Sequence, residues 1–359
     1  MDRKTYLEIN VDNIYHNYDL FVSKTGKKLI PVVKANAYET IDYKIASYLQ
    51  EKGADFFAVS SLDEAIRLRK HNINSDILIM GYVHDLAAIK EYDLSIIIPT
   101  KEYAYEHKDE LKGIKTHIKI NTGLNRLGII PSETKEVLEL LLNNDAVVEG
   151  VMTHYACADD VDYTYQQYYL FKDTVESLNY NFKYIHTAAT DAALYLEDEI
   201  SNYTRIGLGL FGYTNIESDW DLKPALSLKA EIIACKKVNE GEGVSYGHHY
   251  ISDGSGYILT AAIGYADGID RRLEDKVVYV NDEKCKVVGT VCMDLIMIKS
   301  NNPHKIGEEV EIFGDHISVK ERIKDFNTCC CRLITDISVR VTRIFKKDNK
   351  IDCSINERI

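Results

Sequence analysis

Short apolar runs alternate with helical patterns over the first 210 residues. The runs are five to eight residues long, which is the usual length of a strand. The predicted strands are residues 28–35, 54–60, 76–80, 95–99, 116–120, 146–153, 182–187 and 203–208. Between several of them the apolar positions recur at helical spacing, for example in residues 131–144 and 162–178.

Eight strand–helix units in this length match an α/β fold of the (β/α)8, or TIM-like, barrel type. A doubly wound parallel sheet is the competing architecture, because it has the same alternation of strands and helices. Ser61 and Glu64 have the spacing of a capping box, which predicts that a helix begins directly after Ser61.

The pattern changes after Asp221, where strand-like segments follow one another with Gly and Asp turns between them. These segments are residues 225–238, 257–266, 276–280, 284–300, 308–314 and 336–345. Helical periodicity is scarce here, so we expect a mainly-β C-terminal domain. We place the barrel in residues 1–224, with about the first eight residues able to pair with the second domain, and the second domain in residues 225–359.

Composition and charge narrow the classes of partner. The chain of 359 residues carries 43 Lys and Arg against 56 Asp and Glu, a formal net charge of −13. Phosphate repulsion therefore argues against general binding to nucleic acid or to anionic membranes. No apolar stretch approaches a membrane span, and the segment MDRKTYLEIN lacks the apolar core of a secretory signal, so we expect a cytoplasmic protein.

The eight cysteines suit reduced thiols rather than a metal centre. They show no paired CxxC spacing, and Cys329, Cys330 and Cys331 are consecutive. Neighbouring side chains in a strand point to opposite faces, so three thiolates there would not converge on one ion. We expect no metal site.

Lys34 is the first candidate for chemistry, because it ends the first predicted strand in the segment PVVKANAY. The carboxyl ends of parallel strands face the active site of α/β barrels. A lysine between Val33 and Ala35 there fits an amine of lowered pKa that forms a Schiff base with an aldehyde. The local sequence alone favours the alternative, a lysine that extends from the barrel rim to solvent.

Gly207, Gly209 and Gly212 form a G-x-G-x-x-G pattern, which by itself suggests a dinucleotide site. The pattern follows the eighth predicted strand instead of opening the first unit, and HTAAT (186–190) follows the seventh. Barrels bind single phosphates in the loops after their last two strands. A lysine on the first strand and a phosphate cradle on the last two together describe a pyridoxal 5'-phosphate site.

The sequence resembles the alanine racemase family over nearly its whole length. The motifs are VKANAY, THIKINTGLNRLGI, MTHYACAD, HTAAT, TRIGLGLFG, VSYG, IGYADG, GTVCMD and SVRVTRIF, in the family's order. The resemblance implies a pyridoxal phosphate-dependent isomerase that interconverts L- and D-alanine. It also implies a homodimer whose active site is shared between subunits, a small amino acid as substrate, and supply of D-alanine for peptidoglycan.

The resemblance implies two catalytic bases, because racemisation requires a base on each face of a planar carbanion. Lys34 would be the Schiff-base lysine and one base, and Tyr246 in VSYG the other base, contributed by the partner subunit. Tyr38 would bind the cofactor phosphate. Arg205 would face the pyridine nitrogen, and His154 would hold Arg205.

The remaining roles come from the same resemblance. Arg126 would reach the cofactor hydroxyl and the substrate carboxylate, and Lys119 would brace Arg126, as a free amine or as a carbamate. Residues of the phosphate cup and the substrate pocket complete the set: Thr190, Gly207 and Leu208 in the cup, Met293 and Asp294 of the partner subunit in the pocket, and Tyr265 and Cys331 in support.

The sequence departs from the family pattern at several of these motifs. Glu39 and Thr40 replace the usual Gly-His after the lysine motif, Asn121 replaces an aspartate, Ala189 an asparagine and Thr290 an arginine. Cys331 falls where a tyrosine commonly touches the phosphate and narrows the way into the substrate pocket. A wider pocket predicts a substrate range beyond alanine, with serine the first candidate.

Other functions compete with this interpretation. A non-enzymatic pyridoxal phosphate carrier would lack the second domain, and a decarboxylase of the same fold would place an acid where Arg205 stands. An inactive racemase homologue is compatible with the departures from the motifs.

Overall fold

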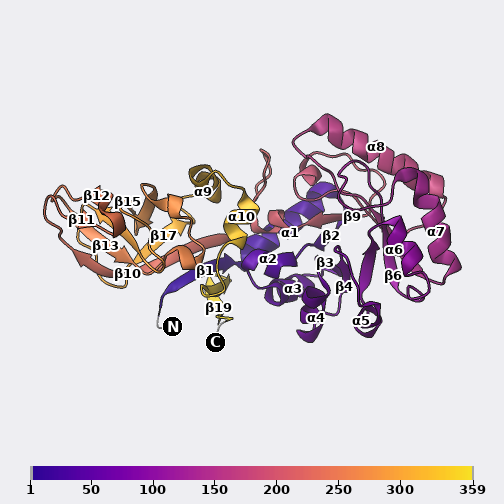
Figure 1. Ribbon diagram of the computed structural model, residues 1–359, viewed down its shortest axis with the longest axis horizontal. Coiled ribbons are helices and arrows are strands. Elements are labelled where there is room, and N and C mark those ends of the chain that lie inside the picture. The colour runs from indigo at the N-terminus through magenta and orange to yellow at the C-terminus, as the bar shows by residue number, and fades with distance from the viewer. Residues whose placement is uncertain (1–2, 358–359) are drawn as a thin grey trace. The chain divides into compact units, whose positions relative to one another are not determined.

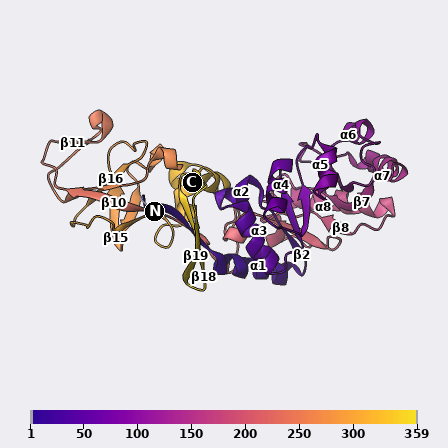
Figure 2. The same ribbon diagram turned by 90° about the horizontal axis from the view of Figure 1, so that it is seen from below.

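The computed structural model describes residues 3–357, which divide into two compact units. One unit contains residues 15–223, and the other contains residues 224–357 together with the N-terminal residues up to Ile14. Each unit has its own sheet, as the ribbons of Figure 1 and Figure 2 show.

The first unit is built on eight parallel strands in the order β2-β9-β8-β7-β6-β5-β4-β3. A parallel bridge between Val32 and Ala58 joins the two outer strands, so the sheet closes into a barrel. The predicted fold class is confirmed. The strands are β2 (Lys28–Pro31), β3 (Phe56–Val59), β4 (Asp76–Ile79), β5 (Ser95–Ile98), β6 (Lys115–Lys119), β7 (Val147–Met152), β8 (Tyr184–His186) and β9 (Tyr203–Ile206).

Helices connect these strands on the outside of the barrel, as expected for right-handed crossovers. They are α1 (Val11–Thr25), α2 (Lys34–Glu39), α3 (Asp42–Glu51), α4 (Leu62–Lys70), α5 (Leu86–Glu91), α6 (Lys101–Glu106), α7 (Thr134–Asn143) and α8 (Val161–Leu178). The predicted capping box is present: Ser61 accepts from the Glu64 amide, and Glu64 accepts from the Ser61 amide. The predicted start of α4 directly after Ser61 is therefore confirmed.

Apolar and aromatic side chains fill the barrel interior. Every residue of strands such as β3 and β5 is buried, so these strands are covered on both faces. Its central cluster is Ile30, Val32, Phe56, Ala58, Leu78, Ile97, Met152, Tyr184 and Tyr203. This packing leaves the ends of the strands as the places where polar side chains can gather.

The second unit is a nine-stranded sheet in the order β13-β16-β15-β14-β17-β10-β1-β18-β19, and an added pairing of β13 with β10 closes part of it on itself. Strand β1 pairs antiparallel with β10 and parallel with β18. The strands are β1 (Thr5–Asn10), β10 (Leu226–Lys236), β13 (Tyr257–Ala261), β14 (Val277–Val280), β15 (Glu283–Val287), β16 (Ile296–Ser300), β17 (Glu309–Phe313), β18 (Thr342–Lys347) and β19 (Lys350–Ile355), with β11 (Gly243–Val244) and β12 (Tyr250–Ile251) as a separate ribbon.

Three segment predictions in this unit were too long. The run 257–266 is a strand only as far as Ala261, where β13 ends. The run 284–300 is two strands, β15 and β16, separated by an ordered loop that carries the VCMD motif. The run 336–345 becomes a strand only at Thr342. The short helices α9 (Val319–Phe326) and α10 (Cys330–Thr335) were not predicted.

No helix among residues 3–357 combines the length and the apolar character needed to cross a bilayer.

Candidate active site

Lys34 begins an unusual left-handed turn at the end of the first barrel strand. Residues 35–39 all have positive φ, between 50° and 61°, and none of them is glycine. Such a conformation costs about 1–2 kcal/mol per residue, so the surrounding contacts must hold it. One contact is a hydrogen bond of 2.7 Å from the Ala35 amide to Oε1 of Glu64. The turn leaves the Lys34 side chain exposed and the Tyr38 side chain buried.

Tyr38, Thr190 and the glycine turn after β9 meet in one place. A Cβ added to Gly207 would lie 2.1 Å from the Tyr38 hydroxyl oxygen, so only glycine allows this approach. The Gly209 amide donates to Oγ1 of Thr190 at 3.1 Å, and Leu208 between the two glycines is buried. A phenol, a hydroxyl and glycine backbone gathered in this way are groups that bind phosphate oxygens.

Cations gather beside this cup. Lys119 lies buried at the end of β6, and burial lowers its pKa to about 8, helped by the charges of Arg126, Arg205 and Lys34. A set of four cations whose charges act on one another is costly unless an anion binds among them. The arrangement therefore suits a ligand that carries phosphate and carboxylate groups.

Arg205 is buried on β9 and hydrogen-bonded only to neutral acceptors among the described residues. Its NH1 donates to Nδ1 and to the carbonyl of His186, both at 2.9 Å. Its NH2 donates to the carbonyls of Thr153 at 2.8 Å and Thr187 at 2.6 Å and contacts Nδ1 of His154 at 3.1 Å. Burial lowers the pKa of Arg205 to about 10, and it remains charged at neutral pH.

Arginine can only donate, so it fixes the tautomers of the histidines behind it. Nδ1 of His186 must accept, which leaves Nε2 of His186 to donate to Nδ1 of His117 at 2.9 Å. His117 then carries its proton on Nε2. Burial lowers the pKa of His117 and of His154 to about 3, and it lowers the pKa of His186 well below its ordinary value. All three rings are therefore neutral at pH 7.

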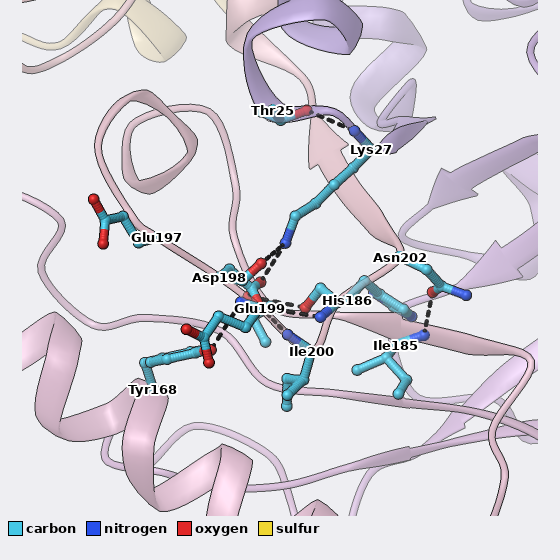
Figure 3. Close-up of polar contacts among 12 residues, drawn as sticks. Thr25, Lys27, Tyr168, Ile185, His186, Glu197, Asp198, Glu199, Ile200 and Asn202 are labelled. Atoms are coloured by element: carbon cyan, nitrogen blue, oxygen red, sulfur yellow. Dashed lines mark hydrogen bonds and ion pairs between the residues drawn. The ribbon is translucent and has the colours of Figure 1, made fainter.

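A partly buried ion pair holds the segment that leads into β9, as Figure 3 shows. Nζ of Lys27 lies 3.3 Å from Oδ2 of Asp198. The same carboxylate accepts from the Thr187 hydroxyl at 2.5 Å and from the Ile200 amide at 3.2 Å. Because the Thr187 carbonyl is an acceptor for Arg205, this pair positions Arg205 indirectly. Sequence reasoning missed it, since Lys27 and Asp198 are 171 positions apart.

Arg126 lies exposed on the loop after β6. The departure at Asn121 leaves this loop well organised, because Oδ1 of Asn121 accepts from the amides of Gly123 at 3.2 Å and Asn125 at 3.0 Å. Its Nδ2 also donates to Oδ1 of Asn125 at 2.9 Å. The amide thus performs the loop-capping role open to an aspartate and adds a donor.

The second unit carries the other predicted residues on adjoining loops with exposed side chains. Tyr246 is 73% exposed, Met293 52% and Tyr265 42%, and Asp294 is exposed as well. The Tyr265 amide donates to the Cys292 carbonyl at 3.0 Å, which ties the GYADG and VCMD motifs together. The GYADG and VCMD motifs therefore form one surface of this unit.

Thr290 and a buried aspartate support that surface. Oγ1 of Thr290 donates to the Tyr246 carbonyl at 3.0 Å, so the residue that departs from the family pattern holds the tyrosine loop. Asp267, fully buried, pairs with Arg3 at 2.6 Å and with Arg340 at 3.0 Å. Arg340 also binds the carboxylate of Asp294 at 2.7 Å, which orients it.

Cys331 lies partly buried on α10 of the same unit. The close approach of Gly268 to the Asp336 carbonyl packs the end of α10 against the GYADG loop. The structure thus gathers the predicted residues into two groups, one in each unit, with Lys34, Tyr38, Lys119, Arg126, His154, Thr190, Arg205, Gly207 and Leu208 in the barrel and Tyr246, Tyr265, Met293, Asp294 and Cys331 in the other unit.

A barrel with a lysine at the end of its first strand and a phosphate-binding turn after its last two strands defines the class of pyridoxal phosphate-binding barrels. Residues 9–215 match the alanine racemase N-terminal domain, and residues 225–345 match the alanine racemase C-terminal domain. The chain belongs to the alanine racemase family.

Individual relatives agree with this assignment over almost the full length. An alanine racemase of Staphylococcus epidermidis is 35% identical, with 97% of this chain and 96% of the relative covered. The crystal structure of an alanine racemase from Bacillus anthracis with bound L-Ala-P has a TM-score of 0.91 and 33% identity, over 99% and 98% of the two chains. A histidine racemase from Leuconostoc mesenteroides is also similar, with a TM-score of 0.90 and 27% identity, over 96% and 98%.

Proposed function

We propose that this chain interconverts L- and D-alanine with pyridoxal 5'-phosphate. The observation that carries the proposal is the meeting of the Lys34 turn with the cup of Tyr38, Thr190 and Gly207, beside a group of cations whose charges act on one another. The Lys34 amine would hold the cofactor aldehyde, and Tyr38, Thr190 and the backbone of Gly207 and Leu208 would hold its phosphate.

When bound, the cofactor supplies an electron-accepting ring that stabilises the negative charge left on the substrate carbon. Arg205 would face the ring nitrogen of that group. Because its guanidinium keeps its protons, Arg205 would leave the ring nitrogen unprotonated and would limit the ring's strength as an electron acceptor. The residue thereby restrains side reactions such as transamination.

Two bases would act from opposite faces of the substrate carbon. The Lys34 amine takes or returns the proton on one face, and the phenol of Tyr246 of the partner subunit does so on the other. The high exposure of Tyr246 supports this role, since a side chain that completes another subunit's site must project from its own. The proposal therefore includes a homodimer.

Arg126 would bind the substrate carboxylate, with Lys119 beside it in the barrel. Met293 and Asp294 of the partner subunit would line the substrate pocket, and Tyr265 and Cys331 would support it. The exposed positions of Met293 and Tyr265 are compatible with this arrangement. Supply of D-alanine for peptidoglycan in the cytoplasm is the biological role that we propose.

The test is direct. The purified protein is incubated with pyridoxal 5'-phosphate and L-alanine, and D-alanine is measured by chiral chromatography. We expect racemisation and visible absorption by the protein-bound cofactor, and we expect Lys34→Ala to lose both. Lys44→Ala, on an exterior helix, is the matched control and should retain both. Colour that persists in Lys34→Ala would overturn the assignment of Lys34.

A further inference from the structure

A carboxylate, a thiol and an imidazole converge in the second unit, away from the residues assigned to the racemase site. Glu283 and Cys285 lie two positions apart on β15, and their alternating burial shows that they share the inner face of the strand. His304 comes from the loop between β16 and β17. One oxygen of Glu283, the sulfur of Cys285 and one ring nitrogen of His304 all lie within 4.8 Å of one another.

The imidazole of His304 is held between two carboxylates. Its Nδ1 lies 2.8 Å from Oε2 of Glu308, and its Nε2 lies 3.2 Å from Oε2 of Glu283. A neutral imidazole has one N–H and can donate to only one of them. If Nδ1 donates to Glu308, the lone pair of Nε2 faces a carboxylate oxygen, which is repulsive unless the ring is doubly protonated or a cation lies between the two atoms.

The cluster is also preorganised by its neighbours. The Ser300 hydroxyl donates to Oε1 of Glu283 at 2.8 Å, and Nδ2 of Asn302 donates to Oε2 at 2.8 Å, which fixes the carboxylate plane. The contact of His304 with Glu308 repeats a common feature of metal sites, in which a carboxylate orients the ligating ring through its other nitrogen. Cys285 is 4% exposed, so its sulfur faces the cluster in a largely dry position.

We propose that Glu283, Cys285 and His304 bind one divalent transition-metal ion of the zinc type. A set with one sulfur, one nitrogen and one oxygen suits Zn²⁺, whereas Mg²⁺ and Ca²⁺ prefer oxygen alone. Zinc–ligand bonds of about 2.0–2.3 Å place tetrahedral ligands roughly 3.5 Å apart, so closure of the cluster needs movements on the order of 1 Å. On binding, the Cys285 thiol would release its proton to solvent, and a water molecule would take the fourth position.

Such an ion would act structurally. It would join β15 to the loop that leads into β17, and a ligand bound only to the folded state raises the stability of that state. The site involves no residue that we assign to racemisation, so its test is independent of the proposed activity.

The experiment uses the purified holoenzyme. The protein is dialysed against zinc sulfate and then against metal-free buffer, and zinc per chain is measured by inductively coupled plasma mass spectrometry. We expect about one ion per chain, a sulfur ligand in the zinc X-ray absorption spectrum, and a rise in Tm with zinc. Cys285→Ser should remove the sulfur signal, and Cys285→Ser and His304→Gln should each weaken zinc binding at least tenfold.

A control distinguishes the site from adventitious binding by another thiol of this unit. Cys329→Ser removes an exposed thiol and should leave zinc binding unchanged. His304→Gln lies on a loop, so it provides a second test if Cys285→Ser does not fold. Absence of retained zinc, or zinc binding that follows Cys329 instead of Cys285 and His304, would overturn the proposal.

Discussion

NH1 of Arg205 donates to Nδ1 of His186 at 2.9 Å, in a position where both side chains are buried. Because the guanidinium cannot accept, this one contact sets the proton positions of His186 and of His117 behind it. Protonation of Nδ1 in either ring would place two hydrogen-bond donors opposite each other. It would also add a positive charge close to that of Arg205. The arrangement is therefore stable only while the histidines are neutral.

We expect acid to destabilise the barrel unit through these rings. His117 has a folded-state pKa of about 3 against 6.5 when unfolded, so between these values the unfolded state binds more protons and stability falls as the pH falls. Each such histidine contributes up to about 1.4 kcal/mol per pH unit. Urea midpoints measured from pH 6.5 to pH 5 should decrease, and His117→Phe should reduce the slope. His84→Phe, at an exposed position, is the control and should leave the slope of midpoint against pH unchanged. If His117→Phe has the same slope as the unaltered protein, His117 does not cause the pH dependence.

Changing Arg205 to glutamate should alter reaction specificity. A carboxylate at the ring nitrogen would favour its protonated form and strengthen the electron acceptor, so transamination should rise relative to racemisation by at least about tenfold, a difference of about 1.4 kcal/mol in barrier heights. Pyruvate and D-alanine formation are measured together. Arg69→Glu, remote from the cup on α4, is the control. An unchanged product ratio in Arg205→Glu would show that Arg205 does not face the ring.

Tyr246→Phe should remove the base on one face. We expect kcat for racemisation to fall by roughly 10²–10⁴, the usual contribution of a general acid–base group. Exchange of the α-hydrogen with deuterated solvent should persist for one alanine enantiomer and be lost for the other, because Lys34 remains. Tyr257→Phe, a strand residue of the same unit, should behave as the unaltered enzyme. Symmetric loss of exchange would assign Tyr246 a structural role.

Lys119 should react with carbon dioxide more readily than the exposed lysines. Its pKa of about 8 means that about 90% of the amine is neutral at pH 9, and the neutral amine is the reactive form. In ¹³C-labelled bicarbonate we expect a carbamate resonance that grows from pH 7 to pH 9. Lys119→Arg should abolish this resonance, and Lys112→Arg, at an exposed position, should retain it. A resonance that survives in Lys119→Arg would place the carbamate elsewhere.

Cys331→Tyr should narrow the substrate range. A cysteine lacks most of the volume of the tyrosine common in the family, so the enzyme should accept L-serine in addition to L-alanine. We expect the ratio of kcat/KM for serine to that for alanine to fall in Cys331→Tyr by about tenfold, and Cys353→Tyr to leave it unchanged. Strict preference for alanine, unaffected by Cys331→Tyr, would refute this hypothesis.

Much of the fold could be predicted because its strands are buried on both faces. Apolar runs mark strands such as β3 and β5, and both of these strands are wholly buried. The same reasoning failed for residues 284–300, because Val288 and Val291 are buried within a loop and imitate the interior of a strand. Burial of apolar side chains alone does not distinguish a buried loop from a buried strand.

The site was harder to derive than the fold. The motif around Lys34 could be located, but its left-handed turn contains no glycine that would signal positive φ. The pair of Lys27 and Asp198 and the meeting of Tyr38 with Gly207 depend on tertiary structure, which local patterns do not encode. The cluster of Glu283, Cys285 and His304 has no familiar ligand spacing, and the expectation of no metal site rested on CxxC patterns and on residues 329–331.

Strand β1 has a practical consequence for dissecting this chain. It lies between β10 and β18, in the interior of the sheet, and is supplied by the opposite end of the polypeptide. A recombinant fragment that starts at residue 225 would lack that strand and expose two unpaired edges, which invites aggregation. Expression of the C-terminal half alone would require residues 3–14 to be added back, as a fused or co-expressed peptide.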